Sequence, residues 1–181
     1  MFFWQILFFL YILRSVRQTK RLRGEHEMSK NIYLAAPFFD ETQKARIERV
    51  LLALGGNETV GEIYIPEEHQ MESEELYSLP WQVGVFKQDV RQVETSDVVV
   101  AILDYVEVDD EIISDPGTIF EVGAAFEAGV PVVMVQFGET SQFNLMLAQS
   151  GTAYFQGEDI PKLKDYDFQN LPQNFTNQPV F

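Results

Sequence analysis

The sequence of 181 residues contains no cysteine. Disulfides, thiolate metal sites and a cysteine nucleophile are therefore excluded, and this composition fits a reducing compartment. Histidine is almost as scarce, since only His26 and His69 are present. The chain has too little histidine for a histidine-based metal site or a serine–histidine–aspartate triad. Any chemistry must rest on carboxylates, and we expect neither a metal ion nor another cofactor.

Positive charge is also in short supply. The chain has 13 Lys and Arg residues against 28 Asp and Glu residues, which gives a formal net charge of −15. A field of this sign repels phosphate backbones, so nucleic acid is not an expected partner. Apolar residues make up 46% of the chain, enough for one compact domain with a substantial core.

The first 27 residues differ in character from the rest. Residues 2–13 are apolar except for Gln5, and basic residues follow them. The run is shorter than the roughly 20 residues of a membrane-spanning helix, and its order of charge and apolarity is the reverse of a secretory signal. A membrane-surface anchor, a packed or disordered extension and a stretch translated upstream of a start at Met28 stay open. We favour the last, which leaves residues 28–181 as a single α/β domain.

From residue 31 onwards, short apolar runs alternate with segments of helical periodicity. The predicted strands cover residues 31–37, 62–66, 97–105, 131–137 and 152–155. The predicted helices cover residues 41–54, 81–94 and 141–150, and another begins near Thr118. The run DVVVAILDY at residues 97–105 is nearly all apolar, which is typical of a central strand. This alternation predicts a doubly wound α/β domain of flavodoxin or Rossmann type, with about five parallel strands and helices on both faces.

In such folds, ligands bind beyond the carboxyl ends of the strands. The segments expected there are residues 36–41, the acidic loop 67–79, residues 104–118 as a second acidic loop, and residues 137–146. We therefore expect several carboxylates along one rim of the sheet.

The motif DPGTIFE, residues 115–121, has two interpretations. In the first, Asp115 to Gly117 form a turn, and Thr118 with Glu121 forms a T-x-x-E capping box. In the second, Glu121 lies in the first turn of a helix at the cleft, where the helix dipole favours its ionised form, as a carboxylate nucleophile requires. Gly117 would then let a ligand approach the backbone closely. One carboxylate cannot serve both purposes, so a nucleophile should point towards the pocket and not back to Thr118.

Five motifs follow one another along the chain: NIYLAAPFF from residue 31, FKQDV from 86, SDVVVAILD from 96, DPGTIFEVGAAFEAGVPVVMV from 115 and FNLMLAQ from 143. In this order and rough spacing they resemble the nucleoside 2-deoxyribosyltransferase family, from about Asn31 to the C-terminus. The resemblance implies a cytoplasmic enzyme of nucleoside salvage. Such an enzyme exchanges the nucleobase of 2'-deoxyribonucleosides through a covalent deoxyribosyl-glutamate intermediate, with net retention.

The resemblance also implies roles for individual residues. By the pattern D-x-G-x-x-x-E, Glu121 is the expected nucleophile, Asp115 holds a sugar hydroxyl, and Gly117 keeps the space beside it open. Asp89 is expected beside the base as proton donor or anchor, and Tyr33 is expected to hydrogen-bond the nucleophile and hold its orientation. By sequence pattern alone, Tyr33 is equally well an ordinary strand tyrosine, and Asp89 a solvated acid on an amphipathic helix.

Asn144 and Met146 resemble the segment that family members lend to the site of a neighbouring subunit. A homo-oligomer, in this family a hexamer, with an active site shared between subunits is therefore implied. Taken alone, Asn144 fits a helix cap and Met146 a core residue. The family also uses its chain end near the site, where this chain has Phe181 in place of the tyrosine often found there.

Two alternatives remain open at this point. A hydrolase could cleave the N-glycosidic bond of 2'-deoxynucleoside 5'-monophosphates with the same kind of glutamate, but the acidic rim lacks cations for a phosphate. A non-catalytic flavodoxin-like module could bind a ligand while Glu121 only caps its helix. The motifs do not distinguish purine from pyrimidine substrates.

Overall fold

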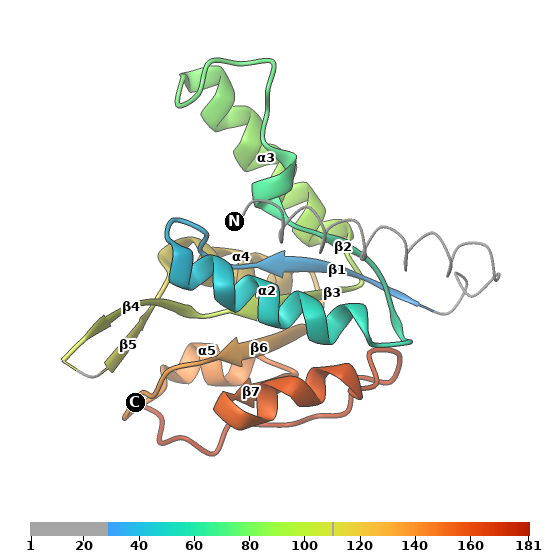
Figure 1. The fold of residues 1–181 in the computed structure, drawn as a ribbon, viewed down its shortest axis with the longest axis vertical. Coiled ribbons are helices and arrows are strands. Elements are labelled where there is room, and N and C mark those ends of the chain that lie inside the picture. The colour runs from blue at the N-terminus through green and yellow to red at the C-terminus, as the bar shows by residue number, and fades with distance from the viewer. Residues whose placement is uncertain (1–28, 110) are drawn as a thin grey trace, which may run out of the picture.

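The computed structural model describes residues 29–109 and 111–181 (Figure 1). The expectation for residues 1–27 lies outside the described residues. The strands are β1 (Lys30–Ala35), β2 (Val60–Tyr64), β3 (Val98–Ile102), β4 (Asp104–Val108), β5 (Glu111–Ser114), β6 (Val132–Gln136) and β7 (Ala153–Gln156). The helices are α2 (Glu41–Gly55), α3 (Leu79–Thr95), α4 (Pro116–Glu127) and α5 (Leu145–Ser150), with the 3-10 helices η2 (Pro66–His69) and η3 (Gly157–Lys164). Within this described part, no helix is long and apolar enough to cross a membrane.

Five strands form one sheet in the order β2-β1-β3-β6-β7, and all neighbouring pairs are parallel. The predicted doubly wound α/β sheet is confirmed, with an order of flavodoxin type. In this order the direction of winding reverses between β1 and β3. A ligand crevice is therefore expected at the carboxyl ends of these two strands.

Helices cover both faces of the sheet because the side chains of each strand alternate between two buried clusters. In β1, Ile32 and Leu34 join the cluster that contains α2 and η3. Tyr33 and Ala35 point the other way, into the cluster that contains residues of α3, α4 and α5. Every residue of β3 and β6 is buried, as expected for central strands of a parallel sheet.

The central strand is shorter than predicted. β3 ends at Ile102. The backbone of the next residue, Leu103, forms two hydrogen bonds: its N–H donates to the Val135 carbonyl (3.0 Å), and its carbonyl accepts from the Asp115 N–H (3.1 Å). Between Leu103 and Asp115 the chain forms the antiparallel hairpin β4–β5, which projects at the left of Figure 1. The expectation of an acidic loop here was wrong, because Val106 pairs with Ile113 in an antiparallel ladder, with a register shift between Asp104 and Val106, despite the surrounding acids.

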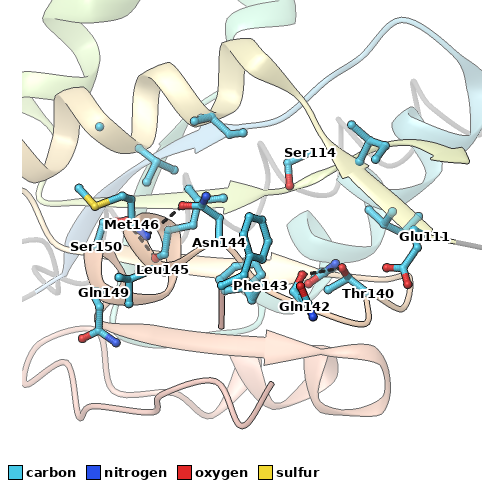
Figure 2. Close-up of a pocket in the computed structure, with 18 of the residues that line it drawn as sticks. Glu111, Ser114, Thr140, Gln142, Phe143, Asn144, Leu145, Met146, Gln149 and Ser150 are labelled. Carbon is cyan, nitrogen blue, oxygen red and sulfur yellow. Dashed lines mark hydrogen bonds between the residues drawn. The ribbon is translucent and has the colours of Figure 1, made fainter. Parts of the chain in front are cut away.

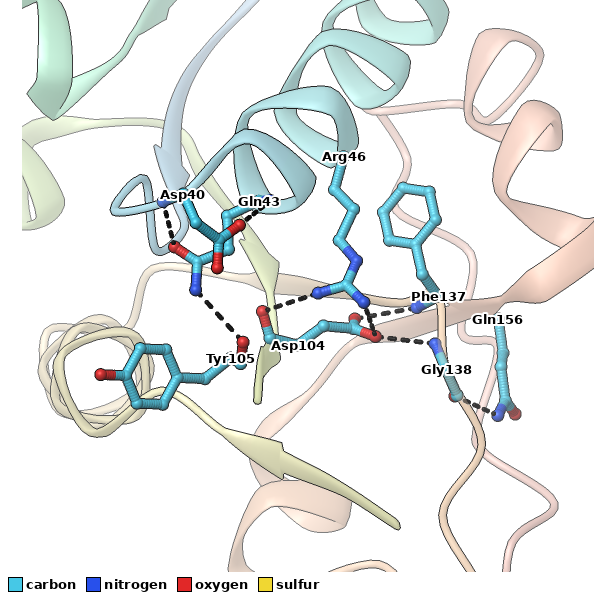
Figure 3. Close-up of polar contacts among 8 residues, drawn as sticks. All are labelled: Asp40, Gln43, Arg46, Asp104, Tyr105, Phe137, Gly138 and Gln156. Carbon is cyan, nitrogen blue, oxygen red and sulfur yellow. Dashed lines mark hydrogen bonds and ion pairs between the residues drawn. The ribbon is translucent and has the colours of Figure 1, made fainter. Parts of the chain in front are cut away.

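A buried carboxylate anchors the base of this hairpin (Figure 3). Asp104 accepts hydrogen bonds from the backbone N–H groups of Phe137 (2.8 Å) and Gly138 (2.7 Å). The Arg46 guanidinium of α2 lies 3.9 Å from its Oδ1, and the Asp104 side chain is fully buried. The hairpin is thereby tied both to the segment that follows β6 and to α2.

The helix predicted over residues 141–150 begins only at Leu145. Phe143 is instead extended and buried, and its N–H donates to Pro179 (2.7 Å). The N–H of Phe181 donates back to the Phe143 carbonyl (3.2 Å), and Leu145 donates to the Phe181 carbonyl (3.1 Å). Pairing with the last residues therefore replaces the first turn of the predicted helix and brings the chain end beside Asn144.

Candidate active site

Helix α4 is capped by Asp115 and not by Thr118. Asp115 Oδ2 accepts hydrogen bonds from the Thr118 N–H (2.7 Å) and from the Thr118 hydroxyl (3.0 Å). The helix begins at Pro116, so Thr118 is already its third residue and Glu121 lies in the second turn. The capping-box interpretation was therefore wrong, and the Glu121 carboxylate is not used to close the helix end.

Gly117 lies in the first turn of α4, against the capping carboxylate. A Cβ atom at this position would lie 3.0 Å from Asp115 Oδ2. Such a contact is tighter than ordinary packing, so a larger residue would displace the Asp115 carboxylate. The absence of a Cβ atom therefore lets the backbone of α4 lie close to the Asp115 carboxylate.

Glu121 points towards strand β1. The Tyr33 hydroxyl donates a hydrogen bond to Glu121 Oε1 at 2.5 Å, across 88 residues of sequence. Tyr33 is fully buried, and burial, followed by the charge of Glu121, raises the pKa of its phenol well above the usual value. The Tyr33 phenol therefore stays protonated and donates a hydrogen bond to the carboxylate, and this hydrogen bond fixes the orientation of Glu121.

The electrostatic setting of Glu121 differs from the one expected. Burial raises the pKa of its carboxyl to about 7; the Tyr33 hydrogen bond lowers it, while the charges of Asp89 and Asp115 raise it further. The sequence favoured an ionised first-turn glutamate because of the helix dipole. That expectation was wrong, because Glu121 lies one turn deeper and the loss of water dominates.

Asp89 of α3 belongs to the same group of side chains. The Tyr64 hydroxyl, at the end of β2, donates to Asp89 Oδ1 at 3.2 Å. Burial raises the pKa of Asp89, while this hydrogen bond and nearby His69 lower it. Asp89 is only partly exposed, so it is not the fully solvated acid of the alternative interpretation.

Three residues of this group were missed by sequence reasoning: Tyr64, His69 and Gln88. The Tyr64 ring stacks on Tyr33 (centroids 5.5 Å apart) and on His69 (4.2 Å). Gln88 Nε2 donates to the Tyr64 hydroxyl at 2.8 Å. The available signal was the position of Tyr64 at the carboxyl end of a predicted strand, where ligands bind. Nothing local marked His69 or Gln88.

Asn144 and Met146 lie elsewhere, at a cavity of about 910 Å³ between the hairpin, α4, α5 and Phe181 (Figure 2). Asn144 caps α5 by accepting from the Met146 N–H at 2.9 Å, and the Met146 side chain is 77% exposed. Asn144 therefore is a helix cap, whereas Met146 is not a core residue. The residues that line this cavity do not include Tyr33 or Glu121. A single chain thus presents the predicted site residues as two separate groups.

The group around Glu121 provides two partly buried carboxyls. Tyr33 donates a hydrogen bond to Glu121, and Tyr64 donates one to Asp89. Such a pair can supply a nucleophile and a proton donor. Across residues 29–109 and 111–181, no three His, Asp or Glu side chains are grouped so that they could hold a metal ion.

Comparison with known proteins decides the family. The model of the family described as nucleoside 2-deoxyribosyltransferase matches residues 32–156. The chain belongs to this family. A nucleoside deoxyribosyltransferase from Limosilactobacillus fermentum is 33% identical over an aligned length of 163, and the match covers 83% of this chain and 94% of that protein. As a nucleoside 2-deoxyribosyltransferase, the chain is a glycosyltransferase that acts on deoxyribonucleosides.

Two solved structures are similar to this transferase. The 2-deoxyribosyltransferase from Bacillus psychrosaccharolyticus has a TM-score of 0.65 and 34% identity, over 81% of this chain and 98% of that chain. A CMP N-glycosidase from Clostridium botulinum has a TM-score of 0.48 and 21% identity, over 75% of this chain and 97% of that chain. The transferase structure therefore supports the same assignment as the sequence.

The Tyr33–Glu121 contact leads to a prediction for the pH dependence of this transferase. A nucleophilic Glu121 must be ionised, so kcat/KM should fall as the pH drops below about 7. The hydrogen bond from Tyr33 lowers the pKa of Glu121, and Tyr33→Phe removes it while keeping the ring. The acidic limb of the pH profile should therefore move to higher pH in the variant. An unchanged limb would show that Tyr33 does not set the ionisation of Glu121.

Proposed function

We propose that Glu121 is the nucleophile of a double displacement that exchanges the nucleobase of a 2'-deoxyribonucleoside for a free base. The observation that carries this proposal is the 2.5 Å hydrogen bond that holds Glu121 Oε1 on Tyr33. Glu121 attacks C1' of the sugar, the bond to the first base breaks, and a deoxyribosyl ester forms. The second base then attacks C1' and releases the carboxylate. Two inversions give net retention.

Asp89 is proposed to manage the proton of the base. The departing base carries away the electron pair of the glycosidic bond, so a proton on its nitrogen makes it a better leaving group. Because burial raises the pKa of Asp89, this carboxyl keeps a proton at higher pH than an exposed aspartate does. Asp115 uses Oδ2 to cap α4, which leaves Oδ1 as the oxygen to accept a hydroxyl of the deoxyribose, next to the space at Gly117.

We further propose a cytoplasmic homo-oligomer, a hexamer, in which Asn144 and Met146 of one subunit complete the site of another. The separation of these residues from Glu121 within one chain supports this arrangement. Large apolar side chains are also exposed on α3, α4 and α5, including Phe86, Phe120 and Leu145. Large apolar side chains that are exposed together on neighbouring helices are typical of protein–protein contacts. The role of Phe181 belongs to the same proposal, with residues 28–181 as one catalytic domain.

A base-exchange assay tests the reaction. The protein is incubated with one deoxyribonucleoside and a different free nucleobase, and the products are separated by chromatography. We expect the new deoxyribonucleoside to accumulate together with the released base. Release of base without formation of the new nucleoside would mean hydrolysis and would contradict the proposal. A panel of purine and pyrimidine acceptors in the same assay establishes which bases are accepted.

A further inference from the structure

We propose that Tyr64 is a positioning residue that decides which oxygen of Asp89 carries the catalytic proton. This inference rests on the proposed function, in which Asp89 protonates the departing base. The Tyr64 hydroxyl contacts Asp89 Oδ1 at 3.2 Å, and Gln88 Nε2 lies 2.8 Å from the same hydroxyl. These two contacts, taken together, fix the direction of the hydrogen bond between Tyr64 and Asp89.

The direction follows from the position of Gln88. Its Nε2 lies 2.6 Å from the backbone carbonyl of His69. A carbonyl only accepts hydrogen bonds, so the side-chain atom beside it must be the NH2 group and not the amide oxygen. The second hydrogen of this NH2 group points at the Tyr64 hydroxyl. Tyr64 therefore accepts from Gln88, and its own hydrogen is directed to Asp89.

The ring that carries this hydroxyl is held on both sides. Tyr33 stacks on Tyr64 with an interplanar angle of 15°, and His69 stacks on it with an angle of 22°. His69 is itself held, because its Nδ1 donates to the Ile65 carbonyl at 2.9 Å. The position of the Tyr64 hydroxyl is thus set by three neighbouring elements, β1, η2 and α3.

A fixed donor at Oδ1 has a consequence for protonated Asp89. When the carboxyl takes up a proton, Oδ1 still receives the Tyr64 hydrogen and so must remain the acceptor. The acidic proton is therefore placed on Oδ2. In the first half-reaction it passes from Oδ2 to the base nitrogen, and in the second half-reaction Oδ2 takes a proton back from the incoming base. Tyr64 itself neither gains nor loses a proton.

The charges around Asp89 are consistent with this role. Tyr64 of β2 and His69 of η2 lower its pKa, against the effect of burial. Glu121 of α4 and Tyr33 of β1 also interact electrostatically with it. Burial raises the pKa of Tyr64, so its phenol stays protonated over the pH range in which the two carboxyls titrate.

The variant Tyr64→Phe tests this inference, since it keeps the ring stack and removes only the hydroxyl. The first half-reaction, release of the leaving base in a single turnover with no acceptor present, is measured with two donors, one with a leaving base that needs protonation and one with an electron-poor leaving group that does not. For the first donor we expect the maximal rate of base release to fall about tenfold, with little change in the donor concentration that gives half of this rate. For the second donor the rate should stay within about twofold of the unmodified protein. Asp89→Asn should give the same pattern with a larger loss.

Tyr166→Phe is the matched control, because the Tyr166 hydroxyl donates to the Pro172 carbonyl at 2.9 Å in the cluster on the opposite face of the sheet. This control variant should leave the rates with both donors unchanged. Gln88→Met is the second test variant, since it removes the group that orients the Tyr64 hydroxyl, and it should show a smaller loss with the same dependence on the leaving group. Gln88→Met decides the question if Tyr64→Phe does not fold.

The outcomes separate this inference from the function on which it rests. If the unmodified protein exchanges bases and Tyr64→Phe retains full activity, or loses rate equally with both donors, the positioning role is wrong. Equal loss would indicate a purely structural tyrosine. If the unmodified protein fails to exchange bases with any acceptor, the proposed function is overturned instead.

Discussion

Replacing Glu121 by alanine is expected to lower the rate of base exchange by at least about a thousandfold while leaving the fold intact, since removal of a covalent nucleophile commonly costs more than that. The loss arises because the substitution removes the carboxylate that Tyr33 holds in place, so C1' has no positioned nucleophile to attack it. Glu121 does not cap α4, because Asp115 does. The substitution therefore removes no cap, so circular dichroism should change little, and any loss of stability should stay within the cost of about 1–3 kcal/mol for the unpaired Tyr33 hydroxyl.

Glu127→Ala is the matched control for this experiment. Glu127 lies on the same helix, is exposed, and should leave the exchange rate unchanged. With donor supplied and acceptor omitted, rapid acid quench and mass spectrometry should reveal one deoxyribosyl group on Glu121 of the unmodified protein. Substantial turnover by Glu121→Ala, or an active protein that never shows the adduct, would argue against a covalent ester on this residue.

Replacing Asp104 by alanine is expected to lower the free energy of unfolding by about 3 kcal/mol. The substitution leaves the partly buried N–H groups of Phe137 and Gly138 without their acceptor, and it leaves Arg46 without its counter-charge. Each unsatisfied buried group costs about 1–3 kcal/mol, so the total loss of stability should exceed the loss that most single substitutions cause. Urea unfolding followed by tryptophan fluorescence measures the change.

Asp159→Ala provides the comparison for Asp104→Ala. Asp159 also forms an ion pair, with Lys162 at 2.6 Å, but both side chains are more than half exposed. Water can replace such a partner, so stability should hardly change. A similar, small loss in both variants would show that the buried anchor of the hairpin contributes no more than a surface ion pair.

The main sheet was predictable from the sequence because its strands are buried on both faces and read as continuous apolar runs. Val98–Ile102 and Val132–Gln136 are the clearest cases. Hairpin β4–β5 was not predictable, since its strands mix acids with apolar residues and its base is held by the distant Phe137 and Gly138. The late start of α5 has a similar cause, because the last residues of the chain pair with Phe143.

The site was predictable in part. The resemblance to the transferases placed Tyr33 beside Glu121, and the structure has these two side chains in contact. The cap could not be settled, because Asp115 and Thr118 are both good capping residues and only the backbone conformation distinguishes them. The ionisation of Glu121 could not be predicted, because it depends on how much water the folded chain excludes. The contact between Tyr64 and Gln88 could not be predicted either, because only tertiary packing brings the two residues together. Their roles in catalysis stay predictions.

The pKa of Glu121 also makes this carboxyl a link between activity and stability. Folding raises its pKa from the ordinary value of 4.5 to about 7, so the folded chain binds this proton more tightly than the unfolded chain. The resulting contribution to stability is fully present below pH 4.5 and is lost as the pH rises through about 7. Ionising the proposed nucleophile therefore weakens the fold, and at this residue the pH range that the proposed reaction requires is the range in which the fold is less stable.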